Sequence, residues 1–287
     1  MSRLVGQIAI VTGAGTGIGR ETALLLAKQG CQVVLVGRRK AMLDPVVASI
    51  NSEGGKAVAR AVDIQKRSEL VELVEWITSN YGIPDIVVHN AGSASKVLNA
   101  RWISEQEWNS TLEVNLTAVF NLTQALLPGM LKRGSGTIVT VSSLAALRPN
   151  LLGGAAYGAA KAAVLNFMGH LHNTFRNQGI RATTILPGET DTPILDNRAR
   201  PPSEQERARM LDPVDVAEAV LLCCTLPLRA VVEEIRIAPT FMRDTSADIE
   251  TARWIGAPSD TFDLPQSHKN KERRDDRSST QDATAKG

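Results

Sequence analysis

The sequence is poor in cysteine and histidine, and each shortage removes a class of protein. Its three cysteines, Cys31, Cys223 and Cys224, form no CxxC pair, so we expect neither a disulfide framework nor a zinc site. Buried thiols in a reducing compartment are the expectation instead. The four histidines show no HExxH or similar spacing, and no metal site is predicted.

Long apolar runs are also missing. The longest, 219–228, is interrupted by Thr225 and Pro227, whereas a membrane-spanning helix needs roughly 20 predominantly apolar residues. The N-terminal residues lack the apolar region of a secretory signal, and 7–12 has the character of a strand. We therefore expect a cytoplasmic protein without a membrane segment.

Excess charge of one sign is absent from the body of the chain. The net charge is +2, and the segment 266–287 holds six Lys or Arg against four Asp or Glu, which leaves 26 of each sign elsewhere. A nucleic-acid partner is not supported. From His268 onward no apolar side chain is larger than that of Ala, so we expect 266–287 to be a disordered polar tail.

Apolar strand-like runs alternate with helical patterns through most of the chain. The expected strands are 7–11, 32–36, 56–62, 85–89, 137–141, 181–186 and 234–237. Continuous apolar strands separated by helices predict a Rossmann-like, doubly wound parallel sheet of seven strands, with helices on both faces in a single domain. We expect a catalytic domain over 1–242 and an extension over 243–265 that packs on it, and ligands outside the carboxyl ends of the strands.

A glycine-rich turn follows the first strand. The run Thr12-Gly13-Ala14-Gly15-Thr16-Gly17-Ile18-Gly19 fails the GxGxxG spacing but contains Gly13-xxx-Gly17-x-Gly19. Such glycines allow a tight turn and let a pyrophosphate approach the backbone where a helix begins. The helix is expected over 17–29, with Gly30 ending it.

Further motifs follow at regular intervals. Asn90-Ala91-Gly92 comes after the fourth strand, Asn115 lies in a helix, and Ser143 and Tyr157-xxx-Lys161 follow the fifth strand. Together with TGxxxGxG, these motifs resemble those of the short-chain dehydrogenases/reductases, over roughly residues 5 to 240. The resemblance implies an oxidoreductase that uses a nicotinamide cofactor.

Tyr157 and Lys161 are four residues apart, so on a helix they share one face. A free phenol has a pKa of about 10 and is a poor base near neutrality, and a neighbouring ammonium favours the phenolate. The resemblance makes Tyr157 the general acid/base and Lys161 the residue that lowers its pKa and holds the nicotinamide ribose. It makes Ser143, rather than Ser142, a hydrogen-bond donor to the substrate oxygen, and Asn115 a helix-shaping residue that supports a water-mediated proton path.

The second strand leads into Gly37-Arg38-Arg39, with no carboxylate before Asp44. A guanidinium there can hold a 2′-phosphate, which favours NADP over NAD. NAD remains the alternative, with Arg38 and Arg39 only covering the start of a helix. The resemblance implies cofactor contacts from Gly13, Thr16, Gly17, Ile18, Gly19, Arg38, Arg39, Asp63, Ile64, Asn90, Ala91, Gly92, Tyr157, Lys161, Pro187, Gly188, Thr190 and Thr192. At Thr190 relatives usually have Val or Ile, so that contact rests on the backbone.

Three segments are expected to border the reacting atoms: 93–102, 144–156 and 189–211. They combine apolar residues with arginines, which suits a carbonyl compound that carries an acidic group. The alternative is that Arg198 and Arg200 are solvated in a Pro-rich lid, and it is the interpretation we favour from the sequence. No substrate follows from this.

The leading hypothesis is an NADP(H)-dependent enzyme that interconverts a secondary alcohol and a ketone. A non-catalytic nucleotide-sensing or interaction protein on the same fold is the alternative. A third reading, an epimerase or dehydratase, would need a larger substrate domain than 194–232 provides. The partner is expected to be a small carbonyl or alcohol compound. By resemblance, helices near 104–132 and 155–178 would pair copies into a homotetramer or dimer.

Overall fold

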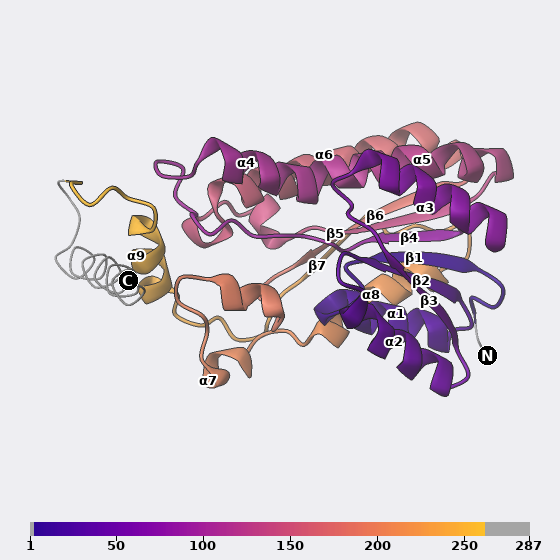
Figure 1. The fold of residues 1–287 in the computed structure, drawn as a ribbon, viewed down its shortest axis with the longest axis horizontal. Coiled ribbons are helices and arrows are strands. Elements are labelled where there is room, and N and C mark those ends of the chain that lie inside the picture. The colour runs from indigo at the N-terminus through magenta and orange to yellow at the C-terminus, as the bar shows by residue number, and fades with distance from the viewer. Residues whose placement is uncertain (1–2, 262–287) are drawn as a thin grey trace, which may run out of the picture.

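The computed structural model describes residues 3–261, which form one parallel sheet between two layers of helices (Figure 1). The strands are β1 Ile8–Thr12, β2 Gln32–Gly37, β3 Lys56–Ala61, β4 Ile86–His89, β5 Gly136–Val141, β6 Ile180–Pro187 and β7 Glu234–Ile237. The seven strands lie in the order β3-β2-β1-β4-β5-β6-β7. The order reverses between β1 and β4, where doubly wound sheets bind ligands. The predicted fold class is confirmed.

Three long helices cover each face of the sheet. Figure 1 shows α3 Arg67–Asn80, α5 Ala118–Arg133 and α6 Ala155–Phe175 on one side, and α1 Gly17–Lys28, α2 Lys40–Ser52 and α8 Pro213–Thr225 on the other. The shorter helices are α4 Glu105–Leu112, α7 Glu204–Arg207 and α9 Ser246–Trp254. Single turns lie at η1 Glu113–Thr117, η2 Leu144–Ala146, η3 Leu151–Gly153, η4 Arg176–Gln178 and η5 Pro193–Asn197.

Successive residues of each strand pack alternately into two apolar cores, one on each face of the sheet. In β1, Ala9 and Val11 pack toward α1, α2 and α8, while Ile8 and Ile10 pack toward α3, α5 and α6. Successive strand side chains point to opposite faces, so a strand covered on both sides must be apolar throughout. This is why the strands read as continuous apolar runs rather than as alternating patterns.

The predicted bounds of the seven strands and of the first helix differ from the observed ones by at most one residue at either end. The third strand ends at Ala61, and the backbone N–H of Val62 donates instead to the carbonyl of Gly37 at 3.1 Å. Helix α1 ends at Lys28, and Gly30 follows at φ +91°. A glycine at that position tolerates the left-handed backbone, as its place after the helix predicted.

The stretch Glu105–Arg133 is a continuous helical segment, and it is the one part of residues 3–261 that is long and apolar enough to cross a membrane. Within it, Leu122, Leu126 and Met130 are buried in the core beneath α5. Its apolar character is thus accounted for by packing on the sheet.

All three cysteines are buried and unpaired, as predicted. Among residues 3–261, no three His, Cys, Asp or Glu side chains gather as a metal site would require.

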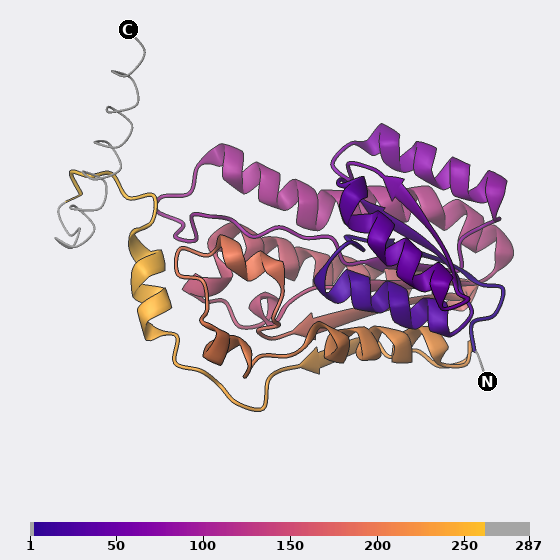
Figure 2. The same ribbon diagram turned by 60° about the horizontal axis from the view of Figure 1, so that its bottom comes forward.

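Helix α9 lies within the expected extension 243–265, for which the sequence predicted no helix. It lies beyond β7 at the end of the molecule far from the N-terminus, as Figure 2 shows. The last residues of the expected extension, 262–265, and the expected tail, 266–287, lie outside the described residues.

Candidate active site

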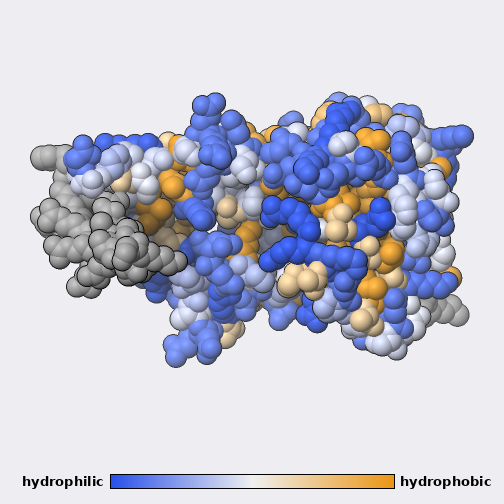
Figure 3. Space-filling view, viewed as in Figure 1, coloured by the Kyte–Doolittle hydropathy of each residue, from blue (hydrophilic) through white to orange (hydrophobic). Residues whose placement is uncertain are grey.

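A cavity of about 770 Å³ opens at the carboxyl ends of the central strands. Its walls include every residue that the resemblance assigned to the cofactor except Gly19. In the space-filling view, apolar surface shows in the hollow between the α4 side and the α7 side, with hydrophilic residues around it (Figure 3). The parallel sheet brings these segments together because all its strands end at the same edge.

The glycine turn forms a tight cradle at the start of α1. Gly13 has φ +66°, and an added Cβ would lie 2.9 Å from the Cα of Ala91. At Gly19 a Cβ would lie 2.3 Å from the amide nitrogen of Asn90 and 2.4 Å from the carbonyl of Gly13. Gly19 therefore shapes the cradle from behind instead of lining the cavity. The first turn of α1 has no acidic residue, which suits an anion at this helix N-terminus.

Asn90 joins the first and fourth strands below the cradle. Its side-chain amide donates to the carbonyl of Thr12 at 3.0 Å, and its backbone N–H donates to the Thr12 hydroxyl at 3.1 Å. The cavity floor at Asn90-Ala91-Gly92 is thus fixed to the turn that it faces.

Two exposed arginines line the cavity beyond β2. The side chains of Arg38 and Arg39 have no ion-pair partner among residues 3–261, whereas the neighbouring Lys40 is bound to Asp44 at 2.7 Å. On the adjacent strand end, Asp63 accepts a hydrogen bond from the backbone of Gln65. The cavity therefore offers uncompensated positive charge where a Rossmann-type fold places the ribose.

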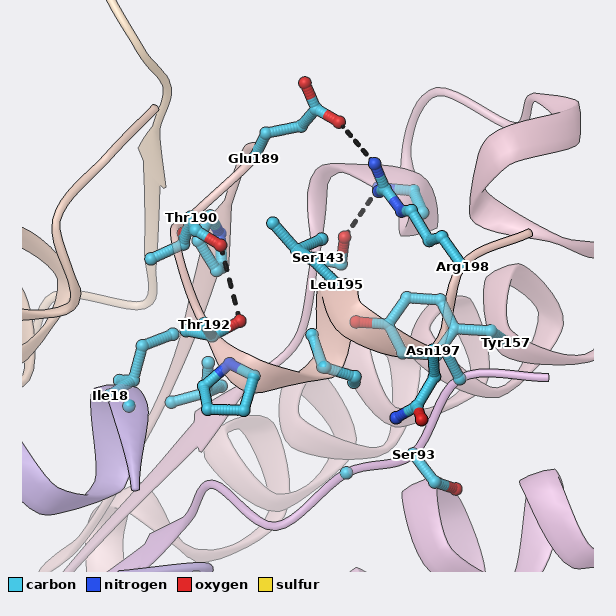
Figure 4. Close-up of a pocket in the computed structure, with 18 of the residues that line it drawn as sticks. Ile18, Ser93, Ser143, Tyr157, Glu189, Thr190, Thr192, Leu195, Asn197 and Arg198 are labelled. Carbon is cyan, nitrogen blue, oxygen red and sulfur yellow. Dashed lines mark hydrogen bonds and ion pairs between the residues drawn. The ribbon is translucent and has the colours of Figure 1, made fainter. Parts of the chain in front are cut away.

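Tyr157 and Ser143 face the same part of the cavity, across from Ile18, Thr190 and Thr192 (Figure 4). Desolvation raises the pKa of the Tyr157 phenol, although a hydrogen bond with Ser143 and the charge of Arg198 lower it in part. The Ser143 oxygen accepts the backbone N–H of Ala145 at 3.1 Å. That bond holds the Ser143 hydroxyl at the cavity while leaving its proton available to donate.

Lys161 lies one turn after Tyr157 on α6, as the spacing predicted. Its side chain is 4% exposed, and its ammonium lies 5.4 Å from the centre of the Tyr157 ring. The ammonium donates to the carbonyl of Val141 at 2.9 Å. Burial lowers the pKa of Lys161 to about 8. Since Val141 takes one hydrogen of the ammonium, two of its three donor hydrogens remain for other partners.

The two adjacent serines have different surroundings. The Ser142 hydroxyl is buried and donates to the backbone carbonyl of Lys161 at 2.9 Å, which ties β5 to α6. Ser143 follows it at the cavity. The structure thus places Ser143, the residue chosen by resemblance, where a substrate oxygen could be reached.

Asn115 lies behind the cavity, in the single π-helical turn η1 between α4 and α5. Its amide group donates to the carbonyls of Ser93 and Thr111, each at 2.8 Å. It thus links the widened turn to the chain that follows Gly92. π-Turns inside helices often mark functional positions, because they free backbone carbonyls from the regular pattern.

The substrate end is bounded by the three segments expected from the sequence. Leu98, Leu152 and Leu195 line it, together with Arg148 and Met210. Arg198 is 21% exposed, so its interpretation as solvated is wrong, whereas Arg200 is 42% exposed, as expected. Arg198 binds Glu189 at 2.7 Å (Figure 4), and Arg200 binds Glu206 at 3.2 Å and also contacts Asp248.

The sequence analysis missed the contribution of the C-terminal segment to this cavity. Phe241, Met242, Arg243, Thr245 and Ile249 all line it. The sequence around Arg243 does not indicate its partners Glu189 and Glu206, which lie in the segment that follows β6. In the folded chain Arg243 forms ion pairs with both Glu189 and Asp248, and this contact is what assigns the three residues to one cluster.

Comparison with known proteins bears on this arrangement. The family model of the short chain dehydrogenases matches residues 7–202. An uncharacterized oxidoreductase of Staphylococcus aureus is 35% identical over 241 residues, which cover 83% of this chain and all of that protein.

Solved structures show the same fold. A metagenomic short-chain oxidoreductase in complex with NADP has 29% identity and a TM-score of 0.73, covering 84% of this chain and 100% of that one. An alcohol dehydrogenase from the archaeon Thermococcus sibiricus, complexed with 5-hydroxy-NADP, has 26% identity and a TM-score of 0.74, covering 83% and 98%. The resemblance drawn from the motifs is confirmed: the chain belongs to the short-chain dehydrogenase/reductase family of oxidoreductases.

Proposed function

We propose that this protein interconverts a secondary alcohol and a ketone with NADP(H) as the redox partner. The observation that carries the proposal is that the Tyr157 hydroxyl and Ser143 face one cavity, with Lys161 beside them and the glycine cradle at its other end. A proton donor, a hydrogen-bond donor and an anion-binding turn are the groups that such a reaction needs.

NADP(H) fits the residues present. The cradle closed by Gly13 and Gly19 leaves room for a pyrophosphate against the backbone, because any side chain there would collide with Asn90 or Ala91. Arg38 and Arg39 supply the positive charge that a 2′-phosphate requires. The end of β2 carries no carboxylate, and this is why NAD is the alternative and not the first choice.

The cofactor, when bound, supplies or accepts the hydride. The protein supplies the proton: because burial raises the pKa of Tyr157, its phenol is protonated near neutrality and is a general acid for ketone reduction. Ser143 donates a hydrogen bond to the same substrate oxygen and stabilises the negative charge that develops on it. Lys161 holds positive charge near the phenol and keeps donor hydrogens for the ribose hydroxyls.

A non-catalytic nucleotide-sensing protein is the second candidate. It would keep the cradle and Arg38 but would have no use for a buried lysine beside a tyrosine. Burying an ammonium that lacks a carboxylate partner destabilises a fold, and among residues 3–261 the ammonium of Lys161 bonds to the carbonyl of Val141 alone. The retention of such a group favours the enzyme.

A panel of ketones and secondary alcohols, followed by the absorbance of NADPH, tests the proposal. Tyr157→Phe should lower kcat by roughly a hundred- to ten-thousand-fold, the usual contribution of general acid catalysis, while NADPH still binds. The chain has one other tyrosine, Tyr81, which is 39% exposed at the end of α3. Tyr81→Phe should therefore retain full activity. Undiminished turnover in Tyr157→Phe would refute the mechanism.

We also propose that copies associate through the outer layer formed by α5 and α6. Phe120 is 40% exposed there, and its ring meets that of Phe167 edge-on at 6.0 Å. An aromatic pair at the surface is a common element of interfaces. Light scattering tests the expected dimer or tetramer, and the cytoplasmic location expected from the sequence stays a prediction.

A further inference from the structure

The segment after β7 lies beyond the residues that the family model matches. The family model ends at residue 202, and the Staphylococcus aureus relative is fully spanned by a match that covers 83% of this chain. About a sixth of this chain is therefore not matched by that relative. Within the described residues, the end of this chain is α9 and the turns around it.

One side of this segment is fixed to the loop at 93–102. The side chains of Asn99 and Trp102 both donate to the backbone carbonyl of Arg253, at 2.9 and 3.2 Å. Just beyond, Gly256 packs so closely that a Cβ would lie 2.9 Å from Val97. Helix α9 thus lies against one wall of the substrate end.

The other side is fixed by Arg243. Its guanidinium binds both oxygens of Glu189, at 2.7 and 2.9 Å, and Glu206 at 3.3 Å, and it also contacts Asp248. The side chains of Arg243 and Asp248 are 7% and 3% exposed. Charged groups this deeply buried persist only when they are paired. Arg243 therefore connects the loop after β6, α7 and α9.

The charges of this cluster cancel. Three guanidinium groups, those of Arg198, Arg200 and Arg243, face the three carboxylates of Glu189, Glu206 and Asp248. An anionic substrate would have to displace a carboxylate to reach them. The remaining C-terminal contribution to the cavity is mainly apolar, from Phe241, Met242 and Ile249, alongside Met210. Phe241 and Met242 are 70% and 93% exposed at its opening.

We propose that the C-terminal segment is the specificity-determining wall of the substrate site, that Arg243 is its positioning residue, and that it selects ketones whose chain is apolar where it reaches Ile249. This inference rests on the proposed function. The charged cluster holds α9 between the loop at 93–102 and the loop after β6, so the apolar side chains present one fixed surface. A substrate chain buried against that surface gains affinity with each methylene.

Methyl ketones from butanone to octanone, reduced with NADPH, test the wall. In the wild type, kcat/KM should rise by about fourfold per methylene, the value of one buried methylene. Arg243→Met and Ile249→Trp should each lower the ratio of kcat/KM for octanone to that for butanone by at least roughly tenfold, chiefly through KM. Arg253→Met is the matched control: Arg253 lies in α9, is 53% exposed and pairs only with Glu250 among residues 3–261. It should keep the wild-type ratio.

The outcomes separate the two proposals. If the wild type reduces none of the ketones, the proposed function fails and the inference fails with it. If ketones are reduced but the octanone-to-butanone ratio is unchanged in Ile249→Trp and in a folded Arg243→Met, only the wall is refuted. Should Arg243→Met not fold, Ile249→Trp decides, because it leaves every ion pair in place.

Discussion

Replacing Lys161 with Met should stabilise the cofactor-free protein at pH 7 while abolishing its activity. The pKa of Lys161 falls from 10.5 to about 8 because the ammonium is buried. At about 1.4 kcal/mol per pKa unit, keeping this lysine charged in the folded state costs about 3 kcal/mol at pH 7. Met removes that penalty but also removes the hydrogen bond to Val141, worth about 1 kcal/mol. The expected net gain is about 2 kcal/mol.

The gain should depend on pH in a defined direction. Below pH 8 both the folded and the unfolded wild type carry the proton on Lys161, so the penalty is present in full. Between pH 8 and 10.5 the folded protein loses this proton while the unfolded chain keeps it, and the penalty fades as the pH rises. At pH 10 less than about 1 kcal/mol of it remains, and the advantage of Lys161→Met should vanish.

Urea unfolding of both proteins at pH 7 and pH 10, without cofactor, measures the difference. The activity of Lys161→Met should fall by at least roughly a hundredfold at pH 7, where the wild type still carries a cation beside the phenol. A variant that is less stable than the wild type at pH 7, or whose stability difference is the same at both pH values, would show that the buried ammonium carries no such penalty.

Two further substitutions test the cofactor end. Arg38→Ala should lower kcat/KM for NADPH relative to NADH by about ten- to a hundredfold, the loss of one charged hydrogen bond. The control is Lys40→Ala, which should leave the ratio unchanged because the Lys40 side chain pairs with Asp44. Equal losses with both cofactors in Arg38→Ala would contradict the NADP assignment. Gly19→Ala should destabilise the fold by about 1–3 kcal/mol and weaken NADPH binding, because its Cβ would lie 2.3 Å from the Asn90 amide. In Gly169→Ala, where nothing lies within 4 Å, thermal unfolding should instead show a slight gain, and similar behaviour of the two variants would argue against the cradle.

Much of the cofactor end of the cavity could be predicted from patterns in short stretches of the sequence. The sheet was predictable because strands covered on both faces must be apolar throughout, as β1 and β2 are. Tyr157 and Lys161 were predictable as a pair because helical spacing alone places them on one face. The position of Gly30 just after the first helix was also predictable, because a helix end favours a residue that tolerates positive φ.

The contacts at the substrate end of the cavity could not be predicted from the local sequence. Arg198 and Arg200 were taken as solvated because their neighbours in sequence are proline and charged residues, and their partners Glu189 and Asp248 become neighbours only in the folded chain. Helix α9 has few apolar residues, since much of its packing is made through Asp248 and the carbonyl of Arg253, and its pattern was therefore too weak to recognise.

The sequence by itself determined the sheet and the glycine turn, because periodicity and spacing act over a few residues. The residues expected at the reacting centre came from the resemblance of the motifs to a known family. Only the tertiary structure decided which carboxylates neutralise the arginines. The resemblance had chosen Ser143 over Ser142, and the packing of β5 against α6 gives the physical reason, because it engages the Ser142 hydroxyl. Arg243 and Glu189 are 54 residues apart, and no local preference encodes their contact. Ion pairing between distant segments depends on where the whole chain places its charges.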